Sequence, residues 1–426
     1  MQYLLEGMTM KFVKNRFSNA GVLFLLSTFP LAGYAAETIT EALTGGKDFA
    51  NLQYRYESVR NPGKASLPNE ANASTVRLRF GYETATFKSF AVLVEAETLK
   101  ALGGEQYNSK ANGRTQYAVV ADPEFTEINQ AYLSYKDLNY RNMIKWGRQR
   151  LILDNARFIG NVGWRQNEQT YDAFTIVNDY LPDTKITAGY LTNVNRVFSD
   201  NALATSGAFA GNHKMRSPIF NVNYKGLGFA ELVGYGYFLD YELPAAHFVN
   251  STKTYGLRMK GTTALGNNDL LYTAEYARQS DHKDNPANYR VHYTFLEGGV
   301  DIKSAEFKLG YEVLGSNGLQ SFSTPLATLH AFNGWVDMFL TTPATGLKDA
   351  YVSAGTTLAD IKFGAIYHDF RADSGSSKFG TEWNFVASKS FTKNYLMGVK
   401  YGRFKSKSAP TRVDTDKLWL WAEAKF

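Results

Sequence analysis

Residues 417–426 read KLWLWAEAKF and decide the fold class. Side chains of a β-strand alternate between its two faces, and here every second residue belongs to one apolar face: Leu418, Leu420, Ala422, Ala424 and Phe426. The other face carries Lys417, Glu423 and Lys425, together with Trp419 and Trp421. One apolar and one charged face is typical of a strand that separates lipid from a watery lumen. The alternative, an edge strand of a soluble β-sandwich, does not explain why the same alternation recurs through the chain.

This alternation predicts eighteen β-strands. They cover residues 49–59, 75–84, 88–97, 129–136, 142–148, 170–178, 184–191, 219–225, 229–239, 253–263, 270–279, 289–300, 305–314, 348–357, 361–370, 379–388, 395–404 and 417–426. Short connections built from Gly, Asn, Asp and Pro alternate with long ones, as in bacterial membrane barrels with turns on one side and loops on the other. The prediction is therefore all-β: a single transmembrane antiparallel β-barrel over residues 37–426, closed by the strand that ends in Phe426.

The composition agrees with a barrel and excludes other classes of protein. After the N-terminal segment, no apolar run reaches the roughly 18 residues that a membrane-spanning helix needs. The 27 Tyr and 29 Phe suit aromatic girdles at two membrane interfaces, and the chain has no Cys. A net charge of +6 over 426 residues is too mild for a nucleic-acid binder. We expect outer-membrane lipid around the barrel, no nucleic-acid partner and no cofactor.

The N-terminus has the pattern of an export signal. A basic stretch precedes the mostly apolar segment 21–32, and small residues follow it. This order is typical of a cleaved signal peptide. We expect residues 1–36 to be removed, with Met10 as an alternative start, and the mature chain to reach the outer membrane of a Gram-negative bacterium. The alternative, a buried N-terminal helix, does not explain the basic flank.

One long loop, residues 315–347, is unusually apolar. Its segment 329–340, LHAFNGWVDMFL, has apolar residues three to four positions apart, which predicts a short amphipathic helix. Apolar surface in water is unfavourable, so we expect this loop to fold inward and to narrow or gate the pore. The alternative is a packed lid without a role in selection.

Strand alternation assigns ten basic side chains to the barrel interior, and we favour six of them as pore residues: Arg55, Arg77, Arg79, Lys145, Arg258 and Lys260. The other four are Lys185, Lys308, Lys362 and Lys400. Four more arginines follow one another beside a strand end: Arg148, Arg150, Arg157 and Arg165. Rings of Arg and Lys lower the barrier for anions, and a guanidinium matches a carboxylate. We predict that these residues line the pore and bind the solute. In the structural alternative, the interior charges form salt bridges that stiffen the wall, and Arg157 and Arg165 pair with Asp154, Glu168 and Asp172 to fix the loop.

Catalysis is not expected. A barrel hydrolase needs a Ser-His or Asp-His pair at the outer rim, and the chain has no G-x-S-x-G or H-E-x-x-H motif. His368 and Asp369 are neighbours in a predicted strand, so their side chains point to opposite faces. His330, in the long loop, is the other histidine able to meet a distant serine. A rim hydrolase is the alternative class, and a purely structural or adhesive barrel is a third.

Two stretches carry a family resemblance. The first contains GRQRL at 147–151, RFIGN at 157–161, WRQ at 164–166 and YD at 171–172; the second is STPLATLHAFNGW at 323–335. These motifs resemble the bacterial alginate export family of outer-membrane porins, and the overall layout is similar along nearly the whole mature chain. The resemblance implies an eighteen-stranded barrel whose cationic lumen passes an anionic uronate polymer. The terminal Phe also resembles the last-strand signal that the outer-membrane barrel assembly machinery recognises.

The interior cations and the resemblance together predict a passive channel for anionic solutes. The favoured solute is a uronate polysaccharide such as alginate, or its oligomers. The alternative is a general or substrate-specific porin for the uptake of small anionic or aromatic nutrients.

Overall fold

The computed structural model describes residues 36–61, 70–202, 210–243, 245–407 and 412–426. The expected signal segment, with the alternative start at Met10, lies outside the described residues except for Ala36. No helix in the described part of the chain is long and apolar enough to cross a membrane. Helix α1 (Ile39–Thr44) precedes the barrel, and the side chain of its N-cap Thr38 accepts a hydrogen bond from the Glu41 amide at 3.1 Å.

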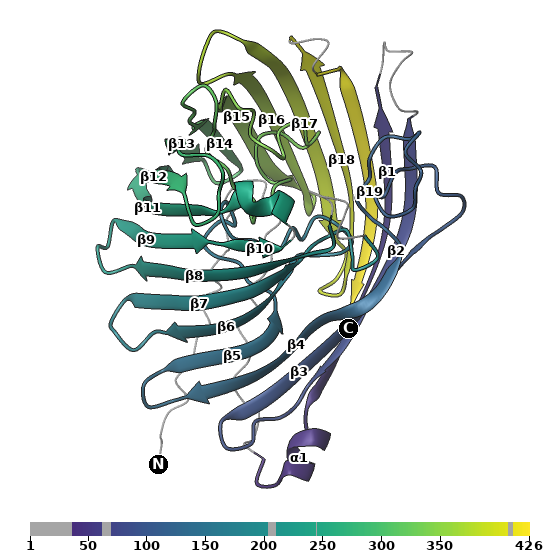
Figure 1. Ribbon diagram of the computed structural model, residues 1–426, viewed down its shortest axis with the longest axis vertical. Coiled ribbons are helices and arrows are strands. Elements are labelled where there is room, and N and C mark those ends of the chain that lie inside the picture. The colour runs from purple at the N-terminus through teal and green to yellow at the C-terminus, as the bar shows by residue number, and fades with distance from the viewer. Residues whose placement is uncertain (1–35, 62–69, 203–209, 244, 408–411) are drawn as a thin grey trace, which may run out of the picture.

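The described residues form one closed antiparallel β-barrel of eighteen long strands (Figure 1). The strands are β1 (Lys47–Arg60), β2 (Ala71–Glu83), β3 (Phe90–Ala101), β4 (Phe125–Asp137), β5 (Asn142–Gln149), β6 (Thr170–Asn178), β7 (Thr184–Asn195), β8 (Asn212–Tyr224), β9 (Ala230–Leu239), β11 (Thr252–Leu265), β12 (Asn268–Asp281), β13 (Arg290–Asp301), β14 (Ala305–Leu314), β15 (Leu347–Leu358), β16 (Ile361–Arg371), β17 (Lys378–Ser390), β18 (Tyr395–Ser406) and β19 (Thr415–Lys425). A short strand, β10 (Tyr241–Leu243), pairs with β8 in the connection that also holds the 3-10 helix η2 (Ala245–Asn250). The predicted fold class and number of barrel strands are confirmed.

The barrel closes between the two ends of the chain. β1 pairs antiparallel with β19 over ten residue pairs, from Asn51 opposite Lys425 to Arg60 opposite Asp416. Beyond this ladder, Ala50 and Phe426 exchange two backbone hydrogen bonds of 3.0 and 2.9 Å. The last strand therefore has partners on both sides, β1 and β18, and the sheet has no open edge at the chain ends.

The period-two alternation of the sequence separates the two faces of the wall. Leu133, Trp146 and Phe174 lie side by side across β4–β6 on the outer face, where Trp146 is 68% exposed. Charged residues lie on the inner face, where Arg55 is 1% exposed because other parts of the chain fill the lumen around it. The outer face thus offers apolar side chains to lipid, and the charges are kept inside.

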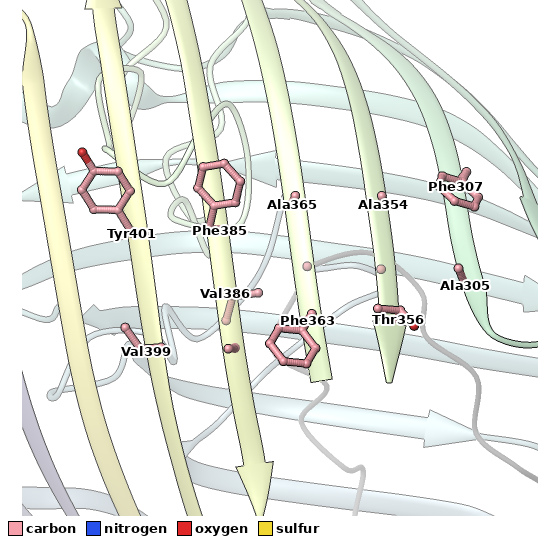
Figure 2. A pocket seen from close by; sticks show the side chains of 13 residues that line it. Ala305, Phe307, Ala354, Thr356, Phe363, Ala365, Phe385, Val386, Val399 and Tyr401 are labelled. Carbon is pink, nitrogen blue, oxygen red and sulfur yellow. The ribbon is translucent and has the colours of Figure 1, made fainter. Parts of the chain in front are cut away.

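The outer face of β14–β18 encloses an apolar hollow of about 500 Å³ (Figure 2). Phe307, Ala354, Ala365, Phe385 and Tyr401 follow one another in a row across these strands. The hollow forms where the two small alanines interrupt the row of aromatic rings, as Figure 2 shows. Its lining is almost entirely apolar, as expected for a surface in contact with acyl chains.

The two ends of the barrel differ in the length of their connections. We call the end with short connections the turn end; there, β15 and β16 are joined by Ala359 and Asp360, whose φ values of 50° and 62° suit a tight hairpin. We call the other end the loop end. It carries the long connections 102–124, 150–169 and 315–346; the last two fill the lumen, and Asp122 near the end of the first also reaches Arg55 inside it.

Candidate functional site in the barrel lumen

Two connections of the loop end meet inside the barrel. Inner loop A is residues 150–169, between β5 and β6, and inner loop B is residues 315–346, between β14 and β15. Ile159 and Leu326 form a parallel β-bridge, and the Gly160 amide donates to the Leu326 carbonyl at 2.9 Å. Because each loop also contacts the wall on its own side, as described next, the two together form a partition across the lumen.

The apolar residues of inner loop B are packed, as expected from its sequence. Phe322 and Leu326 are fully buried, and Phe339 packs against the wall residues Phe370 and Phe404 with ring centroids 4.5 and 6.1 Å apart. The predicted inward folding of the loop is therefore confirmed.

The helix predicted for residues 329–340 is wrong, because the segment consists of turns and bends. Leu329, Asn333, Gly334 and Asp337 all have positive φ values, between 54° and 86°, which a right-handed helix does not allow. The apolar spacing of three to four arises from irregular turns whose side chains reach the wall and inner loop A.

Inner loop A is tied to β1 by charged groups. Arg165 donates to Glu57 of β1 at 2.8 Å and lies 3.7 Å from Asp122. Asp122 in turn lies 3.9 Å from Arg55 and accepts a hydrogen bond from the Gln166 amide at 2.9 Å. Burial alone would lower the pKa of Arg165, but Glu57 and Asp122 raise it above its ordinary value, so the guanidinium stays charged.

Glu168 is the centre of the second set of contacts of inner loop A. Its carboxylate accepts hydrogen bonds from Arg150 at 2.7 Å, from Asn129 at 2.7 Å and from Asn161 at 2.6 Å, and it lies 3.3 Å from Arg79. Burial alone would raise its pKa, but Arg150 and Arg79 hold the pKa of Glu168 well below its usual range. A buried carboxylate with these partners fixes the loop to the wall.

Arg77 and Arg79 hold the backbone of inner loop A as well. Both donate to the Gln166 carbonyl, at 3.4 and 3.3 Å, and Arg79 also donates to Glu97 at 2.5 Å. Arg77 donates to the side chain of Asn51 and forms no ion pair with a described residue. The two predicted pore arginines of β2 are therefore buried supports of the partition.

The contacts of inner loop B reach β14, β17 and β19. Asn333 donates to Glu312 of β14 at 2.6 Å, and the Val336 amide donates to Glu382 of β17 at 2.9 Å. Lys417 of β19 lies 2.8 Å from Asp337. These bonds fix inner loop B to β14, β17 and β19, and inner loop A is held by β1, the strand that pairs with β19.

Arg157 connects the two loops. It donates from inner loop A to Glu312 at 2.7 Å and to Asn333 of inner loop B at 3.0 Å. Arg157 and Arg165 do form ion pairs that fix the loop, as the structural alternative predicted. The predicted partners were wrong, because neither arginine binds Asp154, Glu168 or Asp172. The carboxylates they do bind are distant in sequence.

An aromatic and cationic cluster lies where the loops meet. The ring of Trp164 stacks on His330 with centroids 4.7 Å apart, and Trp419 of β19 packs edge-on against it at 5.8 Å. The ammonium of Lys400 lies 3.7 Å from the Trp164 centroid, and the Arg55 guanidinium 4.3 Å from it. Such cation–π contacts stabilise the Lys400 charge, which forms no ion pair with a described residue, and add to the contact of Arg55 with Asp122.

His330 is held neutral by its surroundings. Burial lowers its pKa to about 3. In the neutral form Nδ1 donates to Asp337 at 2.7 Å and Nε2 accepts from Lys400 at 3.2 Å, which uses both ring nitrogens. His368 likewise has Asp349 as its partner at 2.8 Å. Neither histidine hydrogen-bonds a serine in the described part of the chain, so a rim hydrolase finds no support there.

The remaining predicted site residues lie in different places. Arg258 lies 3.7 Å from Glu275, and Lys145 donates to the Tyr132 hydroxyl at 3.2 Å; both are on the inner face. Lys260 is on the inner face of β11 and reaches solvent. Arg150 is partly exposed, with 28% of its side chain accessible.

Arg148 does not line the lumen. It shares a face with Trp146, two residues earlier in β5, and pairs at 2.9 Å with Asp172 on the outer surface of the barrel. Its proximity in sequence to Arg150 suggested a common cluster, but the strand ends between them. Because side chains alternate along a strand, Arg148 lies on the same face as the lipid-facing Trp146, and this alternation could have predicted its position outside the lumen.

Several interior residues were not predicted from the sequence. Asp122 and Glu97 bind the arginines of β1, β2 and inner loop A, and Trp164 is central to the aromatic cluster. The WRQ motif at 164–166 was the available signal for the last of these. No group of three or more His, Cys, Asp or Glu side chains able to hold a metal ion is found among the described residues.

Solved structures share this fold at low sequence identity. The Acinetobacter baumannii channel OccAB2 matches with a TM-score of 0.70 at 12% identity, covering 91% of this chain and 99% of its own. OccAB4 of the same species matches with 0.69 at 13%, covering 92% and 99%. Pseudomonas aeruginosa OpdK, solved with vanillate, matches with 0.67 at 12%, covering 90% and 99%. At these identities the likeness shows the fold alone.

Sequence comparison gives the family. No curated protein sequence matches the chain significantly. The family model described as alginate export matches residues 49–293, which is more than half of the chain and includes β1 to β12 and inner loop A. The chain is thus an outer-membrane β-barrel channel that belongs to the alginate export family.

Proposed function

We propose that this channel passes anionic solutes passively across the outer membrane, with uronate oligosaccharides or polysaccharide as its substrate class. The loop end faces outward and the turn end faces the periplasm. The observation that carries the proposal is a set of interior cations that form no ion pair with a described residue: Arg77, Lys145, Lys260 and Lys400.

Arg77, Lys145 and Lys400 contact neutral groups, and Lys260 forms no ion pair with a described residue, so no carboxylate of the described chain neutralises these charges directly. The arginines of the partition, by contrast, are neutralised by carboxylates such as Glu57, Glu168 and Glu312. Lys145 of β5 and Lys260 of β11 belong to different parts of the wall, reach solvent at least in part, and lie nearer the turn end than the partition does. They are the cations that a solute in the lumen would meet.

The energy involved is sufficient for selectivity. At about 7 Å, a unit charge lowers the energy of an anion by about 0.6 kcal/mol at the dielectric constant of water and by about 2.4 kcal/mol at an effective value of 20. Since about 1.4 kcal/mol is a factor of ten, each lysine changes the preference for anions by roughly 3- to 50-fold.

The experiment is a reversal-potential measurement in a KCl gradient on single channels in planar bilayers. Lys145→Gln and Lys260→Gln should each lower the anion-to-cation permeability ratio at least about threefold. Arg371→Gln, on the outer face beside Asp369, is the matched control and should leave the ratio unchanged. Cation selectivity in the unmodified channel would overturn the proposal.

A second substrate class, small anionic or aromatic carboxylates, is favoured by the cluster of Trp164, Trp335 and Lys400. The Lys400 ammonium lies 3.7 and 4.2 Å from these two rings, an arrangement that combines aromatic and cationic surface. OpdK, similar in fold, was solved with the aromatic carboxylate vanillate. Current block by uronate oligomers at concentrations where vanillate has no effect favours the first class, and the reverse result favours the second.

A further inference from the structure

Cations on the outer face near the loop end generally have an acidic partner. Lys100 lies 3.3 Å from Glu124, and Arg403 lies 3.6 Å from Asp416. Further pairs of this kind are Arg148 with Asp172, Arg216 with Glu242, Arg371 with Asp369, and Lys405 with Asp414. Lys214 has no ion pair but lines a polar hollow together with Asp172 and Asp200. Charge on this rim is therefore balanced within the protein almost everywhere.

Three neighbouring cations form a group without such partners, whereas Lys378 of β17, also exposed and without an ion pair to a described residue, lies apart from them. Lys253 of β11, Arg278 of β12 and Arg290 of β13 are all exposed, and none forms an ion pair with a described residue. We call them the outer cationic patch. Of the nearby acids, Asp240 is buried, Asp281 accepts the Tyr289 amide at 3.0 Å and Asp284 is exposed, and none of the three forms an ion pair with the patch.

The strand register brings the three charges together. Lys253 and Arg290 both lie opposite Ser280, and Arg278 lies opposite His292 one step nearer the turn end. Because neighbouring strands are about 4.8 Å apart, the Cα atoms of Lys253 and Arg290, on either side of β12, are about 10 Å apart. Lys and Arg side chains are long enough to bring their charged groups together across this distance. Like charges at such spacing repel one another, which leaves the patch in need of an anion from outside the chain.

The patch lies at the upper edge of the apolar band. Two to six residues nearer the turn end on the same strands, the outer face carries Tyr255, Leu257, Tyr276 and Leu296, each more than half exposed. Aromatic side chains of this kind mark the interface between acyl chains and water. Long basic side chains at that level extend toward the headgroups.

We propose that the outer cationic patch binds the phosphate group of a lipid in the outward-facing leaflet. A phosphomonoester carries a charge of about −1.5 to −2 and three acceptor oxygens, and arginine offers it a bidentate fork. The three positive charges of the patch are therefore sufficient to neutralise one such phosphate group, while the apolar band on the turn-end side accepts the acyl chains of the lipid. The site depends on the membrane orientation of the barrel and not on which solute the lumen passes.

The test compares two triple variants of the full chain purified in mild detergent. The patch variant carries Lys253→Gln, Arg278→Gln and Arg290→Gln, and the control carries Lys100→Gln, Arg371→Gln and Arg403→Gln, which removes the same number and type of charges. Binding of lipid A, a phosphorylated lipid, is followed by native mass spectrometry and by the shift in thermal unfolding. At about 1 kcal/mol for each basic residue, the patch variant should bind lipid A roughly 100-fold more weakly than the control.

Phosphatidylcholine and inorganic phosphate are the comparison ligands, and neither should bind the unmodified chain with the affinity of lipid A. Equal lipid A binding by the patch and control variants would overturn the proposal. So would binding of free phosphate as tight as that of lipid A, because the occupant would then not be a lipid. Heat-modifiable migration on a gel shows that the patch variant is folded, and its anion selectivity should be unchanged, which separates this proposal from the proposed function.

Discussion

Neutralising Glu168 should release inner loop A from the wall. The substitution Glu168→Gln keeps the size of the side chain but removes the charge that Arg150 and Arg79 share. Glu168 is 1% exposed, so the two guanidinium groups lose a carboxylate partner that solvent does not replace.

The magnitude follows from the partners that remain. Removing one partner of a buried ion pair costs about 3–5 kcal/mol. Arg79 keeps Glu97 at 2.5 Å, and Arg150 keeps Glu95 at 3.7 Å, so we expect the lower end, about 3 kcal/mol. At about 1.4 kcal/mol for each factor of ten, the ratio of docked to undocked loop should fall roughly a hundredfold.

Single-channel conductance and limited trypsin digestion measure this change. We expect larger and noisier conductance, and new cleavage within inner loop A at Arg157 and Arg165, which are buried in the docked loop. Asp172→Asn is the matched control, because its pair with Arg148 is 25–34% exposed and such pairs contribute about 0–1 kcal/mol. Unchanged conductance together with full protease resistance of Glu168→Gln would refute the role assigned to this carboxylate.

Three further predictions concern the partition. Deleting residues 325–343 should raise single-channel conductance, and an unchanged value would leave inner loop B as a lid without a gating role. Trp164→Ala should destabilise loop docking by about 3–5 kcal/mol, measured as faster proteolysis of both loops. Although burial opposes it, His330 holds the pKa of Asp337 below its usual range, and the pKa of His330 is lowered to about 3 from 6.5. The undocked loop therefore binds more protons than the docked loop, so docking is strongest above pH 6.5 and should weaken as the pH falls toward 3. The measurement is current noise, which should rise over this pH range, and Asp337→Asn should change that pH dependence.

The barrel was predictable because its determinants are local. β6 and β14 have the predicted bounds, since side-chain alternation and turn residues mark both ends of each strand. β8 was predicted to begin at residue 219 and begins at Asn212. Residues 212–218 are polar except for Met215 and Pro218, so no apolar alternation marks that part of the strand.

The pairing inside the lumen was not predictable in the same way. Arg157 meets Glu312 across 155 positions of sequence, a contact set by the path of two irregular loops. Asn333-Gly334 is a local turn signal inside the segment predicted as a helix, and it prevailed over the apolar spacing. Periodicity thus identified the wall, whereas the partition depends on contacts between distant residues.

The partition also has a consequence for how the chain folds. Closing the barrel joins β1 to β19, the greatest sequence separation in the molecule, and the entropy cost of loop closure and the slowness of folding both increase with such separation. Arg165 of inner loop A binds Glu57 of β1, and Asp337 of inner loop B binds Lys417 of β19, so the two loops hold the two sides of this seam. Glu57 and Lys417 themselves lie 4.0 Å apart. We expect the inner loops to dock late in folding and to slow the separation of β1 from β19. Loosening either loop should therefore shorten the lifetime of the closed barrel more than it slows barrel formation.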